Sequence, residues 1–226
     1  MGRGPAGRLP GRYAFGGALP ELVGMVAPDR RRQGIATALL DAALRLCRDQ
    51  GCPQVLLVVP RQSHAGSALA LARGGLLDHS EHALALLTEP TTGTDDPRVR
   101  LRPAGPADAG EVSRLLSEGF GTGPAEAPRP GTLLVEVEGA AVGTLRLIRD
   151  GDDAGVYGLV VDSGWRGRGI GRDVLRRVCR RLRAEGARRV GLEVAVDNPA
   201  ALRLYTSLGF TEVTTEDYYA VATQVQ

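Results

Sequence analysis

We expect an α/β fold in which a mixed, mostly antiparallel sheet is flanked by helices. Two observations predict it. Short segments rich in Val, Leu and Ile follow one another with only turn residues between them, which is typical of antiparallel strands. Other segments of the same chain carry apolar residues at three- and four-residue steps, which is the period of an amphipathic helix.

The composition is that of a globular protein with a real core, because 43% of the 226 residues are hydrophobic. No apolar run approaches the roughly 20 residues of a membrane helix, so we expect no membrane partner and a cytoplasmic location. Three cysteines without a CxxC pair suggest neither a disulfide framework nor a metal site. All 28 basic residues are arginine, and acidic residues balance them to a net charge of +2. We therefore interpret the arginines between Arg166 and Arg189 as a solvated helix face, not as a nucleic-acid site.

The chain is expected to hold two unequal parts. The stretch TEPTTGTDDP, from Thr88 to Pro97, has linker composition, so residues 1–90 and 98–226 are predicted as domains joined by residues 91–97. The two parts resemble each other. VAPDRRRQGIATALLDAAL, from Val26, parallels VDSGWRGRGIGRDVLRRVC, from Val161, and in both an arginine follows five residues after a valine that should end a strand.

The elements of the second part can be predicted in order. A helix from about Pro106 to Phe120 separates the first two strands, and GDDAG should join the next two as a hairpin with a loose loop. The expected strands are Arg98 to Arg102, Thr132 to Glu138, Ala141 to Arg149 and Val156 to Val161. An amphipathic helix follows from about Ile170 and ends near Gly186, with its arginines facing water.

The last third of the chain predicts a strand, a capped helix and a further strand or two. Arg189 to Val196 has the composition of a buried strand, and Asn198 followed by Pro199 is a strong helix start. Gly209 lies where a left-handed residue ends a helix. The final strand segment is Thr211 to Ala222.

The segment RGRGIG combines a strand end, three glycines and a helix start. Such a turn presents consecutive main-chain N–H groups at a helix N-terminus, which makes it an anion site. Glycine-rich turns of purely structural role are also common, so the hexapeptide alone does not distinguish a phosphate site from a structural turn. The spacing matches neither GxGxxG nor GxxxxGK[ST].

Together these residues resemble the GNAT superfamily of acetyltransferases, whose signature is [RQ]xxGx[GA] and whose later segment commonly reads DNxxAxxLYxxxGF. Arg166, Gly169 and Gly171 match the first motif. The second is matched about 30 residues downstream by Asp197, Asn198, Ala201, Leu204, Tyr205, Gly209 and Phe210. The resemblance covers roughly Arg98 to Gln226 and implies a GNAT fold, with a partial GNAT-like copy in the N-terminal part.

The resemblance implies that acetyl-CoA binds where the strand ending at Val161 splays from the strand ending at Val196. It implies an N-acetyltransferase that acts on a primary amine of a small molecule or a protein N-terminus by direct attack. The implied cofactor-binding residues are Leu159, Val160, Val161, Arg166, Gly167, Arg168, Gly169, Ile170, Gly171, Arg172 and Asn198. Tyr205 matches the position that typically supplies the general acid, whereas its alternative role is that of an ordinary core tyrosine.

No carboxylate stands in VYGLVV, where many relatives keep a glutamate as the general base. Glu193 on the next strand is the candidate substitute, because its neighbours Gly191 and Ala195 are small and burial would raise its pKa. An ion pair with an arginine is the equally weighted alternative. Tyr218, Tyr219 and Glu216 on the final strand could line the acceptor pocket or lie at the surface.

The N-terminal part is expected to be a catalytically inactive partial copy, or a copy whose start lies upstream of Met1. Its loop retains Arg31, Gly34 and Ala36, so anion binding by its amides stays open. Aligning Gly75 with Gly209 places Leu71 opposite Tyr205 and His64 opposite Asn198, which removes the acid. The tandem arrangement resembles that of the mycothiol synthases, so mycothiol-type acetylation is a narrower alternative. A non-catalytic acetyl-CoA sensor or interaction module is the other alternative, and a homodimer stays open.

Overall fold

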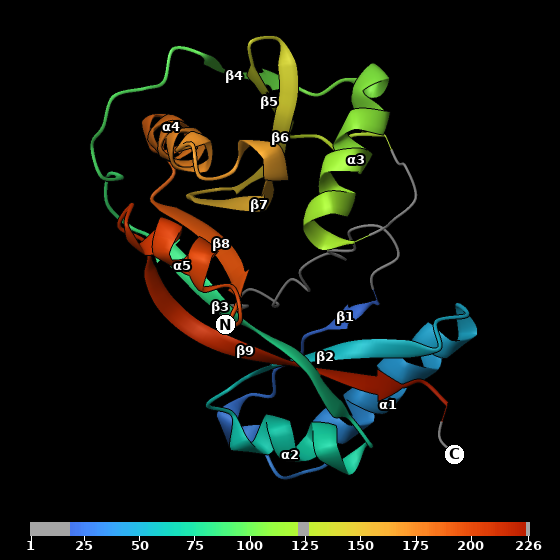
Figure 1. The fold of residues 1–226 in the computed structure, drawn as a ribbon. Helices are drawn as coiled ribbons and strands as arrows, with labels where there is room; N and C mark the ends of the chain where they lie inside the picture. Colours follow the sequence, from blue (N-terminus) through green and yellow to red (C-terminus); the bar gives the residue numbers. More distant parts are fainter. Residues whose placement is uncertain (1–18, 122–126, 225–226) are drawn as a thin grey trace. The chain divides into compact units, whose positions relative to one another are not determined.

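A computed structural model describes residues 19–121 and 127–224 (Figure 1). The chain forms two units. One comprises the residues up to Ser80 together with those from Thr215 on, and we call it the N-terminal unit; the other, Glu81–Thr214, is the central unit. Two strands, β3 (Leu76–Leu86) and β9 (Thr211–Ala222), run from one unit into the other. No helix in the described ranges is long and apolar enough to cross a membrane.

The central unit is built on a mixed sheet whose strands are mostly antiparallel, which confirms the expected fold class. Its consecutive strands β4 (Val99–Pro103), β5 (Thr132–Val137), β6 (Ala140–Asp150) and β7 (Asp153–Val161) pair antiparallel. Strand β8 (Arg189–Ala195) pairs with β7 in parallel and with β3 antiparallel. The turn between β6 and β7 is tighter than expected, since Asp150 pairs with Asp153 and Gly151 takes a left-handed φ of 60°.

Helices cover both faces of this sheet. Helix α3 (Ala109–Phe120), preceded by a 3₁₀ turn at Pro106–Asp108, packs Val112 and Leu115 against Leu134 of β5. The neighbouring β5 residues Leu133 and Val135 point the other way and join the main core with helices α4 (Ile170–Ala184) and α5 (Pro199–Thr206). This core stabilises the central unit, because it buries most of the apolar side chains of α4.

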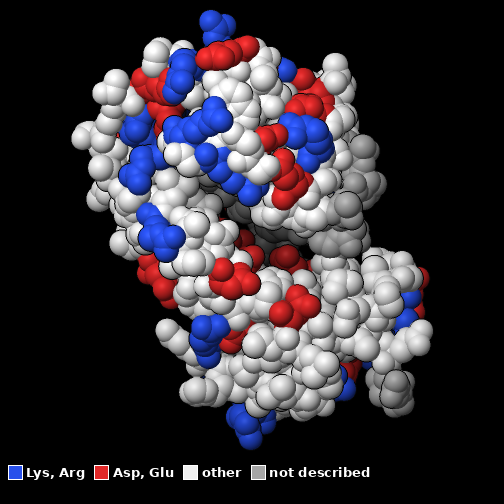
Figure 2. Space-filling view, viewed as in Figure 1, with Lys and Arg blue, Asp and Glu red and all other residues white. Residues whose placement is uncertain are grey.

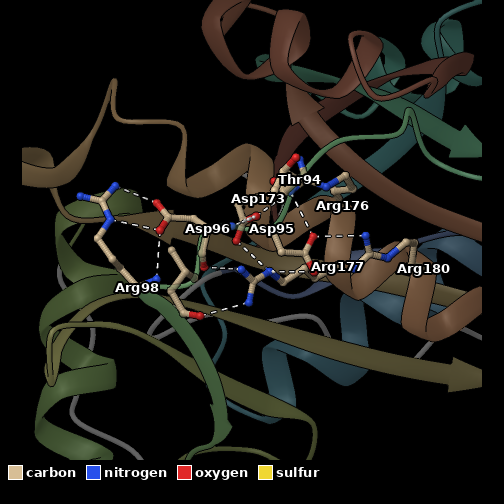
Figure 3. Close-up of polar contacts among 9 residues, drawn as sticks. Thr94, Asp95, Asp96, Arg98, Asp173, Arg176, Arg177 and Arg180 are labelled. Carbon is tan, nitrogen blue, oxygen red and sulfur yellow. Dashed lines mark hydrogen bonds and ion pairs between the residues drawn. The ribbon is translucent and has the colours of Figure 1, made fainter.

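Helix α4 differs from expectation in the exposure of its arginines, because not all of them face water. The side chain of Arg176 is 7% exposed and lies 2.6 Å from Asp173, whose side chain is 6% exposed. Arg176 also donates to the main-chain oxygen of Thr94, and Arg180 pairs with Asp95 (Figure 3). Buried charges need partners, and Thr94 and Asp95 of the expected linker supply them. This part of the linker is therefore bound along α4.

The N-terminal unit contains β1 (Glu21–Leu22), a 3₁₀ turn at Pro28–Arg30, α1 (Ile35–Asp49), β2 (Gln54–Pro60) and α2 (His64–Ala72). Strand β2 pairs in parallel with β1 and antiparallel with the end of β9. The core joins Leu40 and Leu44 of α1 to Val55 of β2 and to Tyr219 of β9. Val26 lies outside β1, so the expected strand end is wrong. Among the described strands β1 pairs only with β2, and this pairing ends at Leu22 opposite Leu57, before the chain reaches Val26.

The two units contain a structural repeat with a constant offset of 135 residues. β2, α2 and β3 begin at residues 54, 64 and 76, and β8, α5 and β9 begin at residues 189, 199 and 211. The offset corrects the expected alignment by one residue. Ser63 corresponds to Asn198, since each caps its helix by accepting the N–H three residues later, and Ala70 corresponds to Tyr205. We call residues 21–86 the first repeat and residues 156–221 the second repeat.

The repeats exchange their last strands. β3 ends the first repeat but pairs with β8 of the second, whereas β9 ends the second repeat but pairs with β2 of the first. The two pairings have equivalent registers, because Glu81 faces Ala195 and Glu216 faces Pro60. The exchange was not foreseen, since strand pairing between distant segments leaves no local pattern. The assignment of residues 1–90 and 98–226 as separate domains of one family remains a prediction.

Candidate functional site

Strand β7 contains a bulge near its end. Arg146 of β6 pairs with Tyr157, but Thr144 pairs with Val160, so that Gly158 and Leu159 both lie opposite Leu145. Gly158 adopts a φ of 57°, which only glycine takes without strain. The bulge shifts the alternation of side chains. Val156 is in the main core before it, Leu159 and Val161 pack against that core after it, and Val160 contacts α3.

Beyond their first residues, β7 and β8 no longer pair. The ladder ends with Gly155 opposite Gly191, although β7 continues to Val161 and β8 to Ala195. The Asp162 N–H donates to the oxygen of Val142 on β6, 2.8 Å away. Because hydrogen-bonding directions alternate along a strand, the Val161 N–H points away from β6, toward the side where β8 has separated. The parting therefore leaves main-chain groups of β7 without a neighbouring strand among the described residues.

The loop after β7 carries the glycine motif. After the 3₁₀ turn at Ser163–Trp165, Gly167 and Gly169 adopt φ values of 75° and 81°, and a Cβ at either would meet nothing within 4 Å. Gly169 is the N-cap of α4, so the first N–H groups of that helix follow it directly. The loop thus offers open space, a helix N-terminus and unobstructed main-chain amides, which fits a diphosphate group.

The arginines of the loop make local contacts. Arg166 Nε donates to the main-chain oxygen of Val161 at 2.7 Å, bridging the end of β7 to the start of the loop. The guanidinium of Arg168 lies 4.8 Å from the centre of the Trp165 ring. Arg172 is exposed in the first turn of α4, whereas the side chain of Ile170 is buried in the core. Ile170 can therefore offer a ligand only its main chain.

Helix α3 braces this loop, which the sequence did not reveal. The Ser163 N–H donates to Glu118 Oε1 at 2.6 Å, and Arg114 donates to Asp162 at 2.9 Å. Hydrogen bonds from Arg114 and from the Gly164 N–H lower the pKa of Asp162. A Cβ on Gly119 would lie 2.4 Å from Val160, so the close approach of α3 to β7 requires glycine there. Gly119 inside a predicted helix was the one feature of the sequence that could have indicated this close contact between α3 and β7.

Tyr205 lies on α5 with its ring in the main core, 6.2 Å from the ring of Phe210. Burial raises its pKa to about 12, so the phenol stays protonated throughout the neutral range. Asn198 caps α5, as the sequence predicts, by accepting the Ala201 N–H at 3.0 Å. Gly209 ends the helical segment with a φ of 101°, also as predicted.

Glu193 differs from expectation, because it is exposed on β8. The expected burial is therefore wrong. Its alternate neighbours Gly191 and Ala195 are half-buried, while the intervening Val190, Leu192 and Val194 belong to the main core. Glu193 thus lies on the sheet face opposite α4 and α5.

The aromatic residues of the final strand do not neighbour β8. Tyr218 and Tyr219 pair with Val58 and Leu57 of β2, and both are buried in the N-terminal unit. Glu216 pairs with Pro60 at the end of β2. The strand exchange accounts for this difference, because β3 pairs with β8 while the end of β9 pairs with β2.

Arginines and acidic residues lie beside one another in the upper part of Figure 2. Arg102, for example, pairs with Asp108 and Glu136, and Arg114 pairs with Glu111 and Asp162. Such pairing lowers the potential that a polyanion would meet.

Comparison with known proteins places these features in context. The sequence profile described as the acetyltransferase (GNAT) family matches residues 24–73 and 102–210. A mycothiol acetyltransferase from Clavibacter michiganensis subsp. michiganensis is 31% identical over 243 aligned residues, which cover 95% of this chain and 76% of that protein. A ribosomal protein bS18-alanine N-acetyltransferase from Salmonella typhimurium is 39% identical over 72 residues. That match covers 31% of this chain and only about half (49%) of the relative.

Solved structures share the fold. A GCN5-related N-acetyltransferase from Sphaerobacter thermophilus superposes with a TM-score of 0.70 at 20% identity, covering 88% of this chain and 71% of that one. A tandem GNAT protein from the clavulanic acid biosynthesis pathway superposes with a TM-score of 0.63 at 19% identity, covering 89% and 74%.

Proposed function

The chain belongs to the GNAT acetyltransferase family and is an N-acetyltransferase, and we propose that its second repeat transfers the acetyl group of acetyl-CoA to a primary amine. The acceptor is a small molecule or a protein N-terminus. The observation that carries this proposal is the parting of β7 from β8 directly before the glycine loop. The first repeat lacks a tyrosine at the position of Tyr205 and is proposed to be inactive.

The binding step uses main-chain groups. In the proposed complex the amides of Gly167 to Gly171 bind the diphosphate, and the pantetheine arm lies along Leu159 to Val161 as an added strand. The open surroundings of Gly167 and Gly169 and the outward direction of the Val161 N–H support this arrangement. Asn198, beside the start of α5, is proposed to contact the coenzyme while it caps the helix.

The chemical step is a direct transfer. The neutral amine attacks the thioester carbonyl carbon, and the carbonyl π electrons move onto oxygen, where a β7 main-chain N–H stabilises the oxyanion. When the oxyanion collapses, the carbon–sulfur bond breaks and the thiolate leaves. Tyr205 donates its proton to the sulfur, which a phenol that stays protonated at neutral pH can do.

The base that takes the proton of the amine is proposed to be Glu193. Its exposure suits a group that must meet an incoming acceptor, and its small neighbours on the same sheet face leave space for that acceptor. Its carboxylate can accept a proton through one bridging water. An ion pair with an arginine is the competing role.

The identity of the acceptor rests on the relatives. The long match to a mycothiol acetyltransferase supports mycothiol-type acetylation as the narrower candidate. The shorter match to a bS18-alanine N-acetyltransferase supports a protein N-terminus. A thiol-release assay with acetyl-CoA should therefore compare small-molecule amines with alanine-ended peptides.

The same assay separates the enzyme from an acetyl-CoA sensor. We expect turnover of at least one amine by the wild-type chain and its near loss in Tyr205→Phe. Binding of acetyl-CoA without turnover of any amine would support the sensor instead and overturn the proposal.

A further inference from the structure

Because of the strand exchange, β3 of the first repeat lies beside β8, the strand that carries the proposed base Glu193. Ala83 of β3 lies opposite Glu193, and Ala85 lies opposite Gly191. Because side chains alternate, these residues share the sheet face that carries Glu193, whereas Leu84 and Leu86 join the main core on the other face. Both strands at this place belong to the central unit.

A second carboxylate lies on this face. Glu81 is opposite Ala195, so it is the diagonal neighbour of Glu193, and it is half-buried. Diagonal neighbours across an antiparallel pair are about 7–8 Å apart, within reach of long side chains. Two glutamate side chains at this spacing can bind two donor groups of one small molecule, since the side chains between them are those of alanine.

The repeat shows why this position matters. Glu216 is the counterpart of Glu81, and without the exchange it would stand opposite Ala195. In the observed fold Glu216 stands opposite Pro60, on the strand of the first repeat. The exchange therefore replaces the expected pocket residue of the final strand by a residue of β3.

We propose that Glu81 is a specificity-determining residue, which selects acceptors that carry a second cationic or hydrogen-bond-donating group beside the amine that reacts. This inference rests on the proposed function and extends it to the substrate class. In this arrangement Glu193 faces the reacting amine and Glu81 holds the second group by a charge-assisted hydrogen bond.

The test uses the full chain and two probes, 1,3-diaminopropane and propylamine, with acetyl-CoA and a thiol-release readout. For the wild type we expect kcat/KM to favour the diamine about tenfold or more, as one charge-assisted hydrogen bond provides. Glu81→Gln should reduce that preference to about twofold by raising KM for the diamine, with KM for acetyl-CoA unchanged. Glu81→Asp should restore part of the preference.

Glu216→Gln is the matched control, because it removes the equivalent carboxylate from the other repeat, and it should keep the wild-type preference. The inference is overturned if wild type shows no preference, if active Glu81→Gln retains it, or if Glu216→Gln loses it equally. Those outcomes leave the proposed function standing. Failure of the wild type to release thiol with any amine would overturn both.

Discussion

Gly34 and Gly169 stand 135 positions apart and adopt nearly the same backbone conformation, with φ and ψ of 77° and −1° at the first and 81° and −4° at the second. Each is the N-cap of a 15-residue helix, and in each loop an arginine Nε donates to the main-chain oxygen five residues earlier. The repeats have therefore kept the same loop. They differ at the position of the proposed acid, which is Ala70 in one and Tyr205 in the other.

Replacing Tyr205 by phenylalanine removes the proposed proton donor and little else. General acid catalysis is typically worth 10²–10⁴-fold, so we expect kcat to fall by about 10²-fold or more while KM for acetyl-CoA stays within about twofold. Tyr219→Phe is the matched control, since Tyr219 has the same exposed fraction, 8%, in the other unit. Steady-state thiol release measures both, and equal losses in the two variants would contradict the assignment.

The raised pKa values predict alkaline destabilisation. Burial raises the pKa of Tyr205 from 10.0 to about 12, and burial followed by the charge of Glu89 raises that of Cys179 from 9.0 to about 12. The folded chain then holds protons that the unfolded chain releases, so the free energy of unfolding should fall between about pH 9 and 12. Over this range the free energy of unfolding of Tyr205→Phe should fall by up to about 3 kcal/mol less than that of the wild type. Urea unfolding at several pH values measures this; parallel curves would refute it.

The buried pair on α4 predicts a large loss of stability when one partner is removed. Arg176→Met removes the closest cation of the buried Asp173 carboxylate and leaves Arg177, 2.8 Å away, as its remaining partner, which should cost about 1.5–3 kcal/mol. Arg181→Met is the control, because Arg181 is 63% exposed and pairs only at the surface with Glu185, and it should cost less than about 1 kcal/mol. Chemical denaturation measures the difference, and similar midpoints for the two variants would disprove it.

The exchanged strands predict that residues 98–226 do not fold stably alone. That fragment lacks β3, which pairs along β8 and contributes Leu84 and Leu86 to the main core. It also leaves the end of β9 without its partner β2. We expect a non-cooperative thermal transition by circular dichroism, and a gain in cooperativity for residues 76–226, which restore β3. Cooperative unfolding of 98–226 at the midpoint of the full chain would contradict the exchange.

Local patterns of the sequence predicted the local elements well. The strands of the second part, the cap at Asn198 and the left-handed Gly209 follow from residue type and spacing alone. Long-range relations escaped prediction. Nothing local in LLDHSEHALAL indicates that it pairs with β8, or that Arg176 is buried against the acidic segment near Thr94. The exposure of Glu193 could not be predicted for the same reason, because it depends on what covers that sheet face.

The central claim is that the glycine loop of the second repeat binds the diphosphate of coenzyme A. Calorimetric titration of coenzyme A into the full chain tests it directly, with Gly169→Ala and Gly34→Ala as matched variants. An alanine in the left-handed conformation costs about 1–2 kcal/mol at either position, so the two variants should lose similar amounts of stability. A difference in their affinity for coenzyme A then reports on the loop itself. We predict that Gly169→Ala weakens binding about tenfold or more. Gly34→Ala should stay within about twofold of wild type, because β1 ends at Leu22 and leaves no strand directly before the first loop to hold the pantetheine arm, whereas β7 runs to Val161. Absence of binding by folded wild type, or equal weakening in both variants, would contradict the account.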